Sequence, residues 1–421
     1  MSFKKTEVGR IPDVWDVKMI QEIGEVISGG TPKTKENSYW DGNISWITPK
    51  DLSSFTERYI DRGERSITEE GLKNSSTKLL PKGTVLFSSR APIGYLAIAK
   101  KELCTNQGFK NIVCNKNYSN NEFLYYMLKA KKNKIESIAG GSTFKEVSGK
   151  VVKEFKIPVP PLPEQKAIAH ILSTLDEKIE VNNQINKTLE NMAQAIFKQW
   201  FVDFEFPNED GESYKSSGGE MVESELGMIP RGWVVKELGD IIELHDSKRV
   251  PLSKKEREKR EKIYPYYGAA SLMDYVDDYI FDGVYVLLGE DGTVINENGN
   301  PILQYVWDKF WVNNHAHVVT GRDNISTNFI YVLLKNINVS GAITGAVQLK
   351  INQKNLKELK IVLPKDVTMI EEFSELINKS FERIRINSDE SNMLINIRDA
   401  LLPKLMSGEI RVPLDEEGEV S

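Results

Sequence analysis

The sequence predicts an α+β protein: two globular mixed α/β domains joined by two long antiparallel α-helices that form a coiled-coil spacer, with a pseudo-two-fold internal repeat. Three observations support this fold class: a long-range repeat, a proline-bounded helical run after each copy, and a composition that can fill two cores. The chain has 421 residues, of which 40% are hydrophobic and 28% are charged. These values are typical of folded domains and exclude wholesale disorder.

Simple counts exclude several classes of protein. Cys104 and Cys114 are the only cysteines, too few for a disulfide scaffold and in keeping with a reducing cytosol. No apolar run approaches the ~20 residues of a membrane span, and the N-terminus lacks an apolar signal region. We therefore expect a cytoplasmic protein with no membrane partner.

Four segments of the chain recur in the same order, 204 to 218 residues later. The first is the pattern Gly-x-Ile-Pro-x-x-Trp, and the others are short helical or strand-like runs. The matching pairs are 9–18 with 227–236, 123–129 with 329–335, 152–157 with 356–361, and 189–196 with 394–401. One match could arise by chance, but four in order indicate a duplicated, domain-sized unit, because the period is too long for a solenoid.

Each copy has the same internal plan. A β-type apolar run predicts a buried strand, a short helix follows, and a proline-bounded stop then introduces a long helix, since proline fits a helix's first turn. These elements lie at 84–87 and 284–288, at 121–132 and 327–336, and at 157–163 and 362–364.

The long helices carry a narrow apolar stripe. From 164 to 201, and again from 370 to 405, apolar residues follow one another mostly at steps of three and four. About 38 residues at 1.5 Å each make a rod of roughly 57 Å. A single core helix is the alternative, but a rod this long favours pairing with its own duplicate. Asn183, Asn186 and Asn387 could set the register of that pair, although a solvated face explains each equally well.

Composition divides the chain further. A stretch rich in Gly, Ser and acidic residues between the copies predicts a flexible linker. The predicted segments are a first globular domain at 1–162, a central long helix at 163–206, a flexible acidic linker at 207–225, a second globular domain at 226–363, a C-terminal long helix at 364–407 and an acidic tail at 408–421.

Local charge reverses the conclusion drawn from total charge. The formal net charge of −6 argues against nucleic-acid binding, yet segment 1–162 carries a net charge of +8 and segment 226–363 is neutral. Within the second domain, 248–262 holds eight basic and three acidic residues and is followed by aromatic residues. A solvated helix face is the ordinary explanation for such a run, but its place in a duplicated protein favours contact with phosphates.

The sequence contains no catalytic pattern. Gly149-Lys150-Val151 fails as a phosphate-binding loop, no dinucleotide fingerprint follows a strand, and the Asn/Asp-Pro-Pro-aromatic pattern of an amino-methyltransferase is missing. His315 and His317 share one strand face but make a weak metal pair, and polar readout or a structural role explains them better. We therefore expect no enzyme activity, bound metal or cofactor in this chain.

Several motifs together resemble the specificity subunit of type I restriction-modification systems. They are the domain openings at 11–15 and 229–233, the helix entry at 157–165, and the helix ends at 192–204 and 400–412. The resemblance covers essentially the whole chain. One departure is Lys365-Asp366, where the first copy has Pro161-Leu162.

The resemblance implies a non-catalytic DNA-recognition subunit. Each globular domain would be a target-recognition domain that reads one half of a bipartite double-stranded DNA site. The helices would space the two halves and dock two methyltransferase subunits, which methylate adenine N6 with S-adenosylmethionine. Translocase-nuclease subunits, joining through the methyltransferase complex and using ATP and Mg, would add restriction. The alternatives are a free-standing sequence-specific DNA-binding regulator and a coiled-coil adaptor that does not bind DNA.

Base readout in the major groove favours Arg, Lys, Asn, Gln and hydroxyl side chains. Polar, glycine-marked loops supply such residues in both domains, and 106–108 and 314–316 occupy similar places in the two copies. The candidate DNA-contacting residues of the first domain are Thr31, Lys33, Lys50, Ser88, Ser89, Arg90, Asn106, Gln107, Ser142 and Thr143. Those of the second are Lys248, Arg249, Lys254, Lys255, Arg257, Tyr266, Tyr267, Glu290, Asp291, Asn313, Asn314, His315, His317 and Gln348. An ordinary exposed loop residue is the alternative for each.

Overall fold

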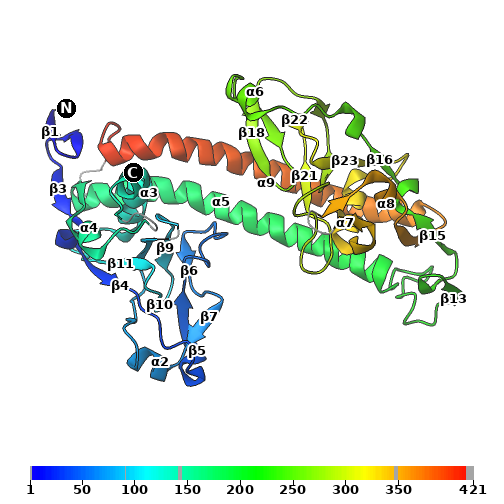
Figure 1. Cartoon of the computed structure of the whole chain (residues 1–421), viewed down its shortest axis with the longest axis horizontal. Coiled ribbons are helices and arrows are strands. Elements are labelled where there is room, and N and C mark those ends of the chain that lie inside the picture. Colours follow the sequence, from blue (N-terminus) through cyan, green and yellow to red (C-terminus); the bar gives the residue numbers. More distant parts are fainter. Residues whose placement is uncertain (1, 91, 141–144, 346–348, 414–421) are drawn as a thin grey trace. The chain divides into compact units, whose positions relative to one another are not determined.

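The computed structural model describes residues 2–90, 92–140, 145–345 and 349–413 (Figure 1). Its contacts divide the chain into two compact units, one formed by Met1–Asn183 with Asp389–Ser421 and the other by Gln184–Ser388. Each unit contains one mixed α/β domain and a segment of both long helices. The predicted fold class is confirmed. No helix in the described part of the chain combines the length and apolar character needed to cross a membrane.

The first domain is built around a five-stranded and a three-stranded sheet. The five-stranded order is β4 (Gly24–Ser28), β11 (Phe109–Cys114), β8 (Val85–Ser88), β9 (Leu96–Ala99) and β6 (Tyr59–Ile60). The three-stranded order is β10 (Cys104–Thr105), β5 (Trp40–Ile47) and β7 (Arg65–Ile67). Two pairs complete the domain: β1 (Phe3–Thr6) with β2 (Gly9–Pro12), and β3 (Asp16–Met19) with β12 (Lys156–Val159). Its helices are α1 (Ile20–Ile23), α2 (Glu69–Lys73), α3 (Asn121–Ser137) and α4 (Gly149–Glu154).

The second domain repeats this plan with two four-stranded sheets. One has the order β16 (Ile242–Leu244), β23 (Ala316–Gly321), β20 (Tyr285–Gly289) and β21 (Leu303–Val306). The other has β18 (Leu272–Val276), β17 (Tyr264–Tyr267), β22 (Lys309–Val312) and β19 (Phe281–Asp282). Three pairs remain: β13 (Met221–Ser224) with β14 (Gly227–Pro230), β15 (Trp233–Glu237) with β26 (Lys360–Pro364), and β24 (Ile343–Thr344) with β25 (Lys350–Ile351). Its helices are α6 (Lys254–Glu258), α7 (Thr327–Asn336) and α8 (Gln353–Lys357).

A predicted strand and a predicted short helix occur in both domains, and the helix has the same type of N-terminal cap in each. The predicted strands correspond to β8 and β20, and the predicted short helices to α3 and α7. Asn120 caps α3 by accepting the amide of Phe123, and Ser326 caps α7 by accepting the amide of Phe329. Short polar side chains favour this position because they satisfy backbone N–H groups that a helix leaves free. Both helices then bury their apolar side chains in the core of their own domain.

The long helices are α5 (Leu162–Phe197), which continues as a short π-helix (Lys198–Val202), and α9 (Thr368–Ser407). Within the first unit they run antiparallel, since Asp176 of α5 accepts from Arg398 of α9 at 2.5 Å while Glu164, earlier in α5, accepts from Arg411, which follows α9. Within the second unit, Asn387 donates to Asn186 at 2.9 Å.

The asparagines predicted to set the helix register are partly confirmed as interface residues. Asn186 and Asn387 lie between the helices, but Asn183 is exposed. Its neighbour Asn182 is buried instead and donates to Ser391 at 3.3 Å. The prediction named Asn183 where Asn182 is the interface residue. The spacing of apolar residues does not show which of two adjacent asparagines faces the partner helix. Whether these residues set the register stays a prediction.

Arg58 fastens the first domain to α5. Its guanidinium is only 5% exposed and lies 3.2 Å from carboxylate oxygens of Glu122, Glu177 and Glu180, the first on α3 and the other two on α5. A buried cation needs such partners because its desolvation would otherwise cost several kcal/mol.

In the second domain, a shared glutamate and aromatic packing connect α7 to the long helices. Tyr331 and Lys335 of α7 both bind Glu190 of α5. Aromatic rings also pack across the domain, with Phe329 contacting Phe373 of α9 at 5.9 Å between ring centroids. Trp15 and Trp233, the tryptophans of the two repeated domain openings, are both buried.

The segment predicted as a flexible acidic linker has regular structure. Its Tyr214 ring stacks on Phe206, and the Tyr214 hydroxyl donates to the carbonyl of Glu220. Residues 221–224 form strand β13. An aromatic residue therefore packs within a stretch whose composition resembles a linker, and the flexibility of the segment stays a prediction. Most of the predicted acidic tail lies outside the described residues, and the other domain boundaries stay predictions.

Candidate DNA interface

Three loops meet at the same end of the main sheet in each domain. The first loop follows β8 or β20, the second precedes β11 or β23, and the third lies before α4 or α8. We call them the tip loops, and their described residues are 88–90, 105–109, 140 and 145–147 in the first domain and 289–291, 312–316, 343–345 and 349–351 in the second. Residues 141–144 and 346–348 lie outside the described part of the chain.

The tip loops of the two domains share the same backbone hydrogen bonds. Ser89 donates its amide to the carbonyl of Gly108 at 2.7 Å, and Glu290 donates to His315 at 2.8 Å. The carbonyl of Ser89 accepts from Val147, and that of Glu290 accepts from Ile351, both at 2.9 Å. These bonds define the structural equivalence of Ser89 with Glu290 and of Gly108 with His315.

An asparagine turn supports the middle loop in both domains. Asn106 accepts the amide of Gly108 through its side chain at 2.8 Å, and Asn313 accepts the amide of His315 at the same distance. The sequence comparison placed 106–108 opposite 314–316, so its match is wrong by one residue. The error arose because Asn313 and Asn314 are adjacent, and only the hydrogen bonds show that Asn313 is the one turned inward. Gln107 and Asn314 are the exposed residues that follow.

On this shared backbone the side chains differ in charge. Arg90 bridges to Glu146 in the first domain, and the equivalent bridge in the second joins Asp291 to Lys350. The sign of each position is therefore reversed. The tip loops of the two domains thus share their backbone hydrogen bonds but carry opposite charges at these two positions.

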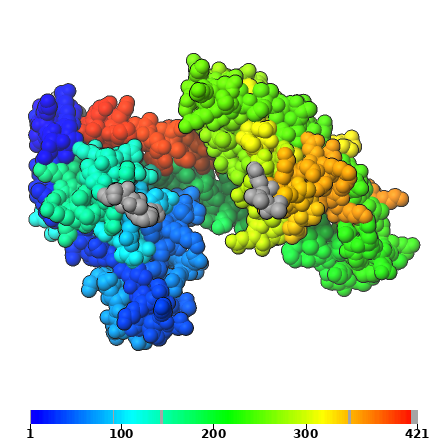
Figure 2. Space-filling model, in the orientation of Figure 1, coloured from blue at the N-terminus to red at the C-terminus, as the bar shows by residue number. Residues whose placement is uncertain are grey.

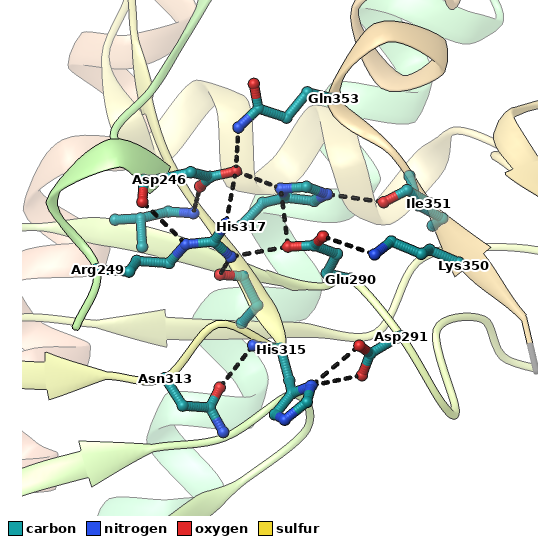
Figure 3. Close-up of polar contacts among 12 residues, drawn as sticks. Asp246, Arg249, Glu290, Asp291, Asn313, His315, His317, Lys350, Ile351 and Gln353 are labelled. Carbon is teal, nitrogen blue, oxygen red and sulfur yellow. Dashed lines mark hydrogen bonds and ion pairs between the residues drawn. The ribbon is translucent and has the colours of Figure 1, made fainter. Parts of the chain in front are cut away.

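A buried charge network supports the tip loops of the second domain (Figure 3). Asp246 lies 2.5 Å from Nδ1 of His317 and 2.6 Å from Nε2 of Gln353, and its other oxygen accepts the amide of Val318 at 2.9 Å. Arg249 pairs with both Asp246 and Glu290, at 3.4 and 2.8 Å. The side chains of Asp246 and His317 are 3% and 1% exposed, so this network belongs to the interior.

The two ring nitrogens of His317 both face acceptors. Nδ1 faces Asp246, and Nε2 lies 2.8 Å from the carbonyl oxygen of Ile351. A doubly protonated ring satisfies both contacts as a donor. Burial alone would raise the pKa of Asp246, but the hydrogen bonds from His317 and Val318 and the charge of Arg249 outweigh it, and the pKa lies below its usual value.

The donor atoms of Asp246, Glu290 and His317 are close enough to one another to hold a metal ion. The guanidinium of Arg249 already lies against both carboxylates, and Lys350 lies 3.2 Å from Glu290. These cations would repel a metal ion and already supply the positive charge that the carboxylates need. The cluster fits an ion-pair network better than a metal site.

Several predicted DNA-contacting residues are buried, so they are not accessible to DNA in this structure, and the prediction is corrected for them. Their polar atoms bind neighbouring backbone or side chains inside the domain, because a polar residue beside glycine in sequence can equally stabilise a loop from within. These residues are Ser88, Ser89, Tyr266, Asn313 and His317.

The other candidates remain predictions. Those exposed to solvent are Lys33, Lys50, Gln107, Lys248, Lys254, Lys255, Asn314 and His315. Those partly buried are Thr31, Arg90, Asn106, Arg249, Arg257, Tyr267, Glu290 and Asp291. Ser142, Thr143 and Gln348 lie outside the described residues.

The basic run 248–262 divides into two kinds of residue. Helix α6 is labelled in Figure 1, and green atoms of this part of the chain lie on the visible face in Figure 2. This helix carries Lys254 and Lys255, and the Lys254 side chain is 83% exposed. Arg257 is instead 13% exposed and pairs with Asp274 at 3.2 Å. Asp274 belongs to β18, so Arg257 also has an internal partner, and its contact with phosphate stays a prediction.

Comparison with known proteins finds a matching family model and similar sequences. A family model described as "Type I restriction modification DNA specificity domain" matches this chain at 12–191 and 230–388. The type I restriction enzyme MjaIX specificity subunit of Methanocaldococcus jannaschii is 39% identical, over 97% of this chain and 96% of that protein. The type I restriction enzyme HindI specificity subunit of Haemophilus influenzae is 25% identical, over 80% of this chain and 89% of that protein.

One solved structure shows the same fold. It is the crystal structure of a type I restriction-modification system S subunit from M. genitalium, with a TM-score of 0.57 and 19% identity. The match covers 94% of this chain and 96% of that chain. The two ranges matched by the family model correspond to the two copies of the repeat.

Proposed function

Since the chain belongs to the family of type I restriction-modification DNA specificity subunits, and is a non-catalytic DNA-recognition subunit, we propose that its two domains read the two different halves of one bipartite DNA site. Each target-recognition domain would take one half through its tip loops. The bases between the halves would go unread.

One observation carries this proposal: the tip loops of the two domains have the same backbone hydrogen bonds but different side chains. The hydrogen bonds that shape the tip loops recur in both domains, whereas Arg90 and Glu146 of the first domain become Asp291 and Lys350 in the second. A duplicated reader of two different sequences needs this combination. The backbone must place a side chain against a base edge, and the side chain must differ for each base pattern.

We propose further that α5 and α9 determine the gap between the half-sites and dock two methyltransferase subunits. Both helices contribute residues to both units, so their length is the natural determinant of the gap. Each unit also carries exposed apolar side chains on its helical segments, including Val181 and Met393 in the first and Leu376 and Ile386 in the second. These exposed apolar side chains on the long helices are where we propose that the partner subunits dock.

The chemistry would then belong to the partners. The methyltransferase subunits would use S-adenosylmethionine to methylate adenine N6, and translocase-nuclease subunits with ATP and Mg would supply restriction. Sequencing the methylated adenines of the host genome, with and without this gene, tests the proposal. We expect a gapped motif with two defined halves that disappears with the gene. A contiguous motif would contradict it.

A further inference from the structure

His315 stands at the tip of the second domain with one ring nitrogen occupied and the other open. Nδ1 lies 2.8 and 2.9 Å from the two carboxylate oxygens of Asp291 (Figure 3). Among the described residues no hydrogen bond engages Nε2, and the side chain is 49% exposed. The ring is therefore held by one edge and presents the other edge to solvent.

The carboxylate of Asp291 determines where the ring carries its proton. A carboxylate only accepts hydrogen bonds, so the Nδ1 atom that faces both of its oxygens must be the donor. In the neutral ring the proton is then on Nδ1, and Nε2 is left as an acceptor.

The backbone on both sides of this pair is fixed. The amide of His315 is held by Asn313 and its carbonyl by Glu290, while Asp291 sits in a strand bridge to Lys350. Glu290 is in turn bound by Arg249 in the buried network. A reading group must be placed within a fraction of an ångström, and a rigid support of this kind provides that placement.

We propose that His315 reads one base of the half-site bound by the second domain, with Nε2 accepting a hydrogen bond from a major-groove amino group, adenine N6 or cytosine N4. Guanine and thymine present acceptors at the corresponding edge, and an acceptor discriminates against them. Asp291 is a positioning residue that orients the ring and fixes its proton. This inference rests on the proposed function.

The first domain lacks this device. Gly108 occupies the place of His315 and has no side chain to offer, and Arg90 occupies the place of Asp291. The base preference that His315 imposes must therefore be confined to one half of the site, which gives the test an internal control.

The test uses the full chain expressed with its methyltransferase subunits, followed by sequencing of methylated adenines. His315→Ala should relax one position of one half, with a roughly 2- to 12-fold loss of discrimination at that position, as expected for one hydrogen bond, and leave the other half unchanged. His315→Arg replaces an acceptor with a donor, so guanine should replace adenine or cytosine at the same position. Glu297→Ala, at an exposed residue of the second domain outside the tip loops, is the control and should leave the motif unchanged.

Asp291 has its own variants. Asp291→Ala should relax the same position, and adding it to His315→Ala should relax the motif no further. Asp291→Asn keeps an oxygen that can accept from Nδ1 and should restore the preference, which loss of a merely structural contact would not predict.

Two results would overturn the inference. One is an unchanged motif in both His315→Ala and His315→Arg, and the other is relaxation of both halves together. Failure of the proposed function is recognised separately, because the motif of the unmodified protein would then not be bipartite.

Discussion

Removing the carboxylate of Asp246 should strongly destabilise the second unit. The side chain is 3% exposed and accepts from His317, Gln353 and Val318 while pairing with Arg249. In Asp246→Ala these groups keep their burial and lose their shared acceptor.

The size of the effect follows from this burial. Removing one partner of a buried ion pair costs about 3–5 kcal/mol, since the remaining charge stays desolvated. For a unit of some 200 residues, 1 kcal/mol shifts the midpoint by roughly 2–4 °C. The unfolding transition of this unit should therefore fall by about 6–20 °C.

Scanning calorimetry of the full chain near pH 7 measures this shift. Asp291→Ala is the matched control, because it removes a carboxylate from the same site whose histidine partner is half exposed; it should cost less than about 1 kcal/mol. A midpoint change in Asp246→Ala no larger than that of the control would show that the buried network does not depend on this carboxylate.

Acid pH adds a second readout for Asp246. Its pKa is lowered on folding, so the stability that it contributes is full above its unfolded pKa of about 3.9 and is lost as the pH falls through the folded value. The difference between the unmodified protein and Asp246→Ala should therefore shrink as the pH falls below about 4. A difference that persists undiminished below about pH 3 would contradict this sign.

Three further predictions concern other parts of the chain. Lys254→Glu with Lys255→Glu should weaken DNA binding by the assembled methyltransferase at all sequences and flatten its salt dependence without changing the motif, as binding titrations at several salt concentrations would show. Asn186→Ala removes the acceptor of a buried amide and should lower the free energy of unfolding by about 1–3 kcal/mol, whereas exposed Asn183→Ala should change it by less than about 0.5 kcal/mol in the same urea titration. Burial raises the pKa of the Cys104 thiol to about 11, so iodoacetamide at pH 8 should leave this thiol unmodified until urea unfolds the chain; rapid labelling of the folded protein would contradict the burial.

The sequence predicted the architecture because duplication and apolar spacing are both visible in one dimension. The Gly-x-Ile-Pro-x-x-Trp openings and the apolar stripes of α5 and α9 identify two copies and two long helices. The contacts of Tyr214 within 207–225 were not predicted, because composition does not reveal which residues an aromatic side chain touches.

The site was predicted less well. Exposed residues such as Asn314 and His315 were identified by their polar character, but that character is shared by Ser89, Tyr266 and His317, whose polar groups point into the domain. Which way a loop side chain faces is decided by long-range strand pairing, which one sequence does not display.

Several supporting residues were missed altogether. Glu146 and Lys350 face the first tip loop in their domains, and Asp246 and Gln353 lie far from His317 in sequence yet contact its network. Aligning the two copies residue by residue would have shown Glu146 opposite Lys350, since their spacing falls within that of the repeats. Asp246 carried no such signal, because its role depends on the register of β16 against β23.

If the proposed function holds, each domain reads its own half of the site independently of the other domain. The most direct measurement is the methylated-adenine motif produced when residues 226–363 are exchanged for the corresponding domain of another family member, with both long helices left intact. One half of the motif should change, while the other half and the gap between them should stay the same. A change in both halves, or in the gap, would contradict the proposed function.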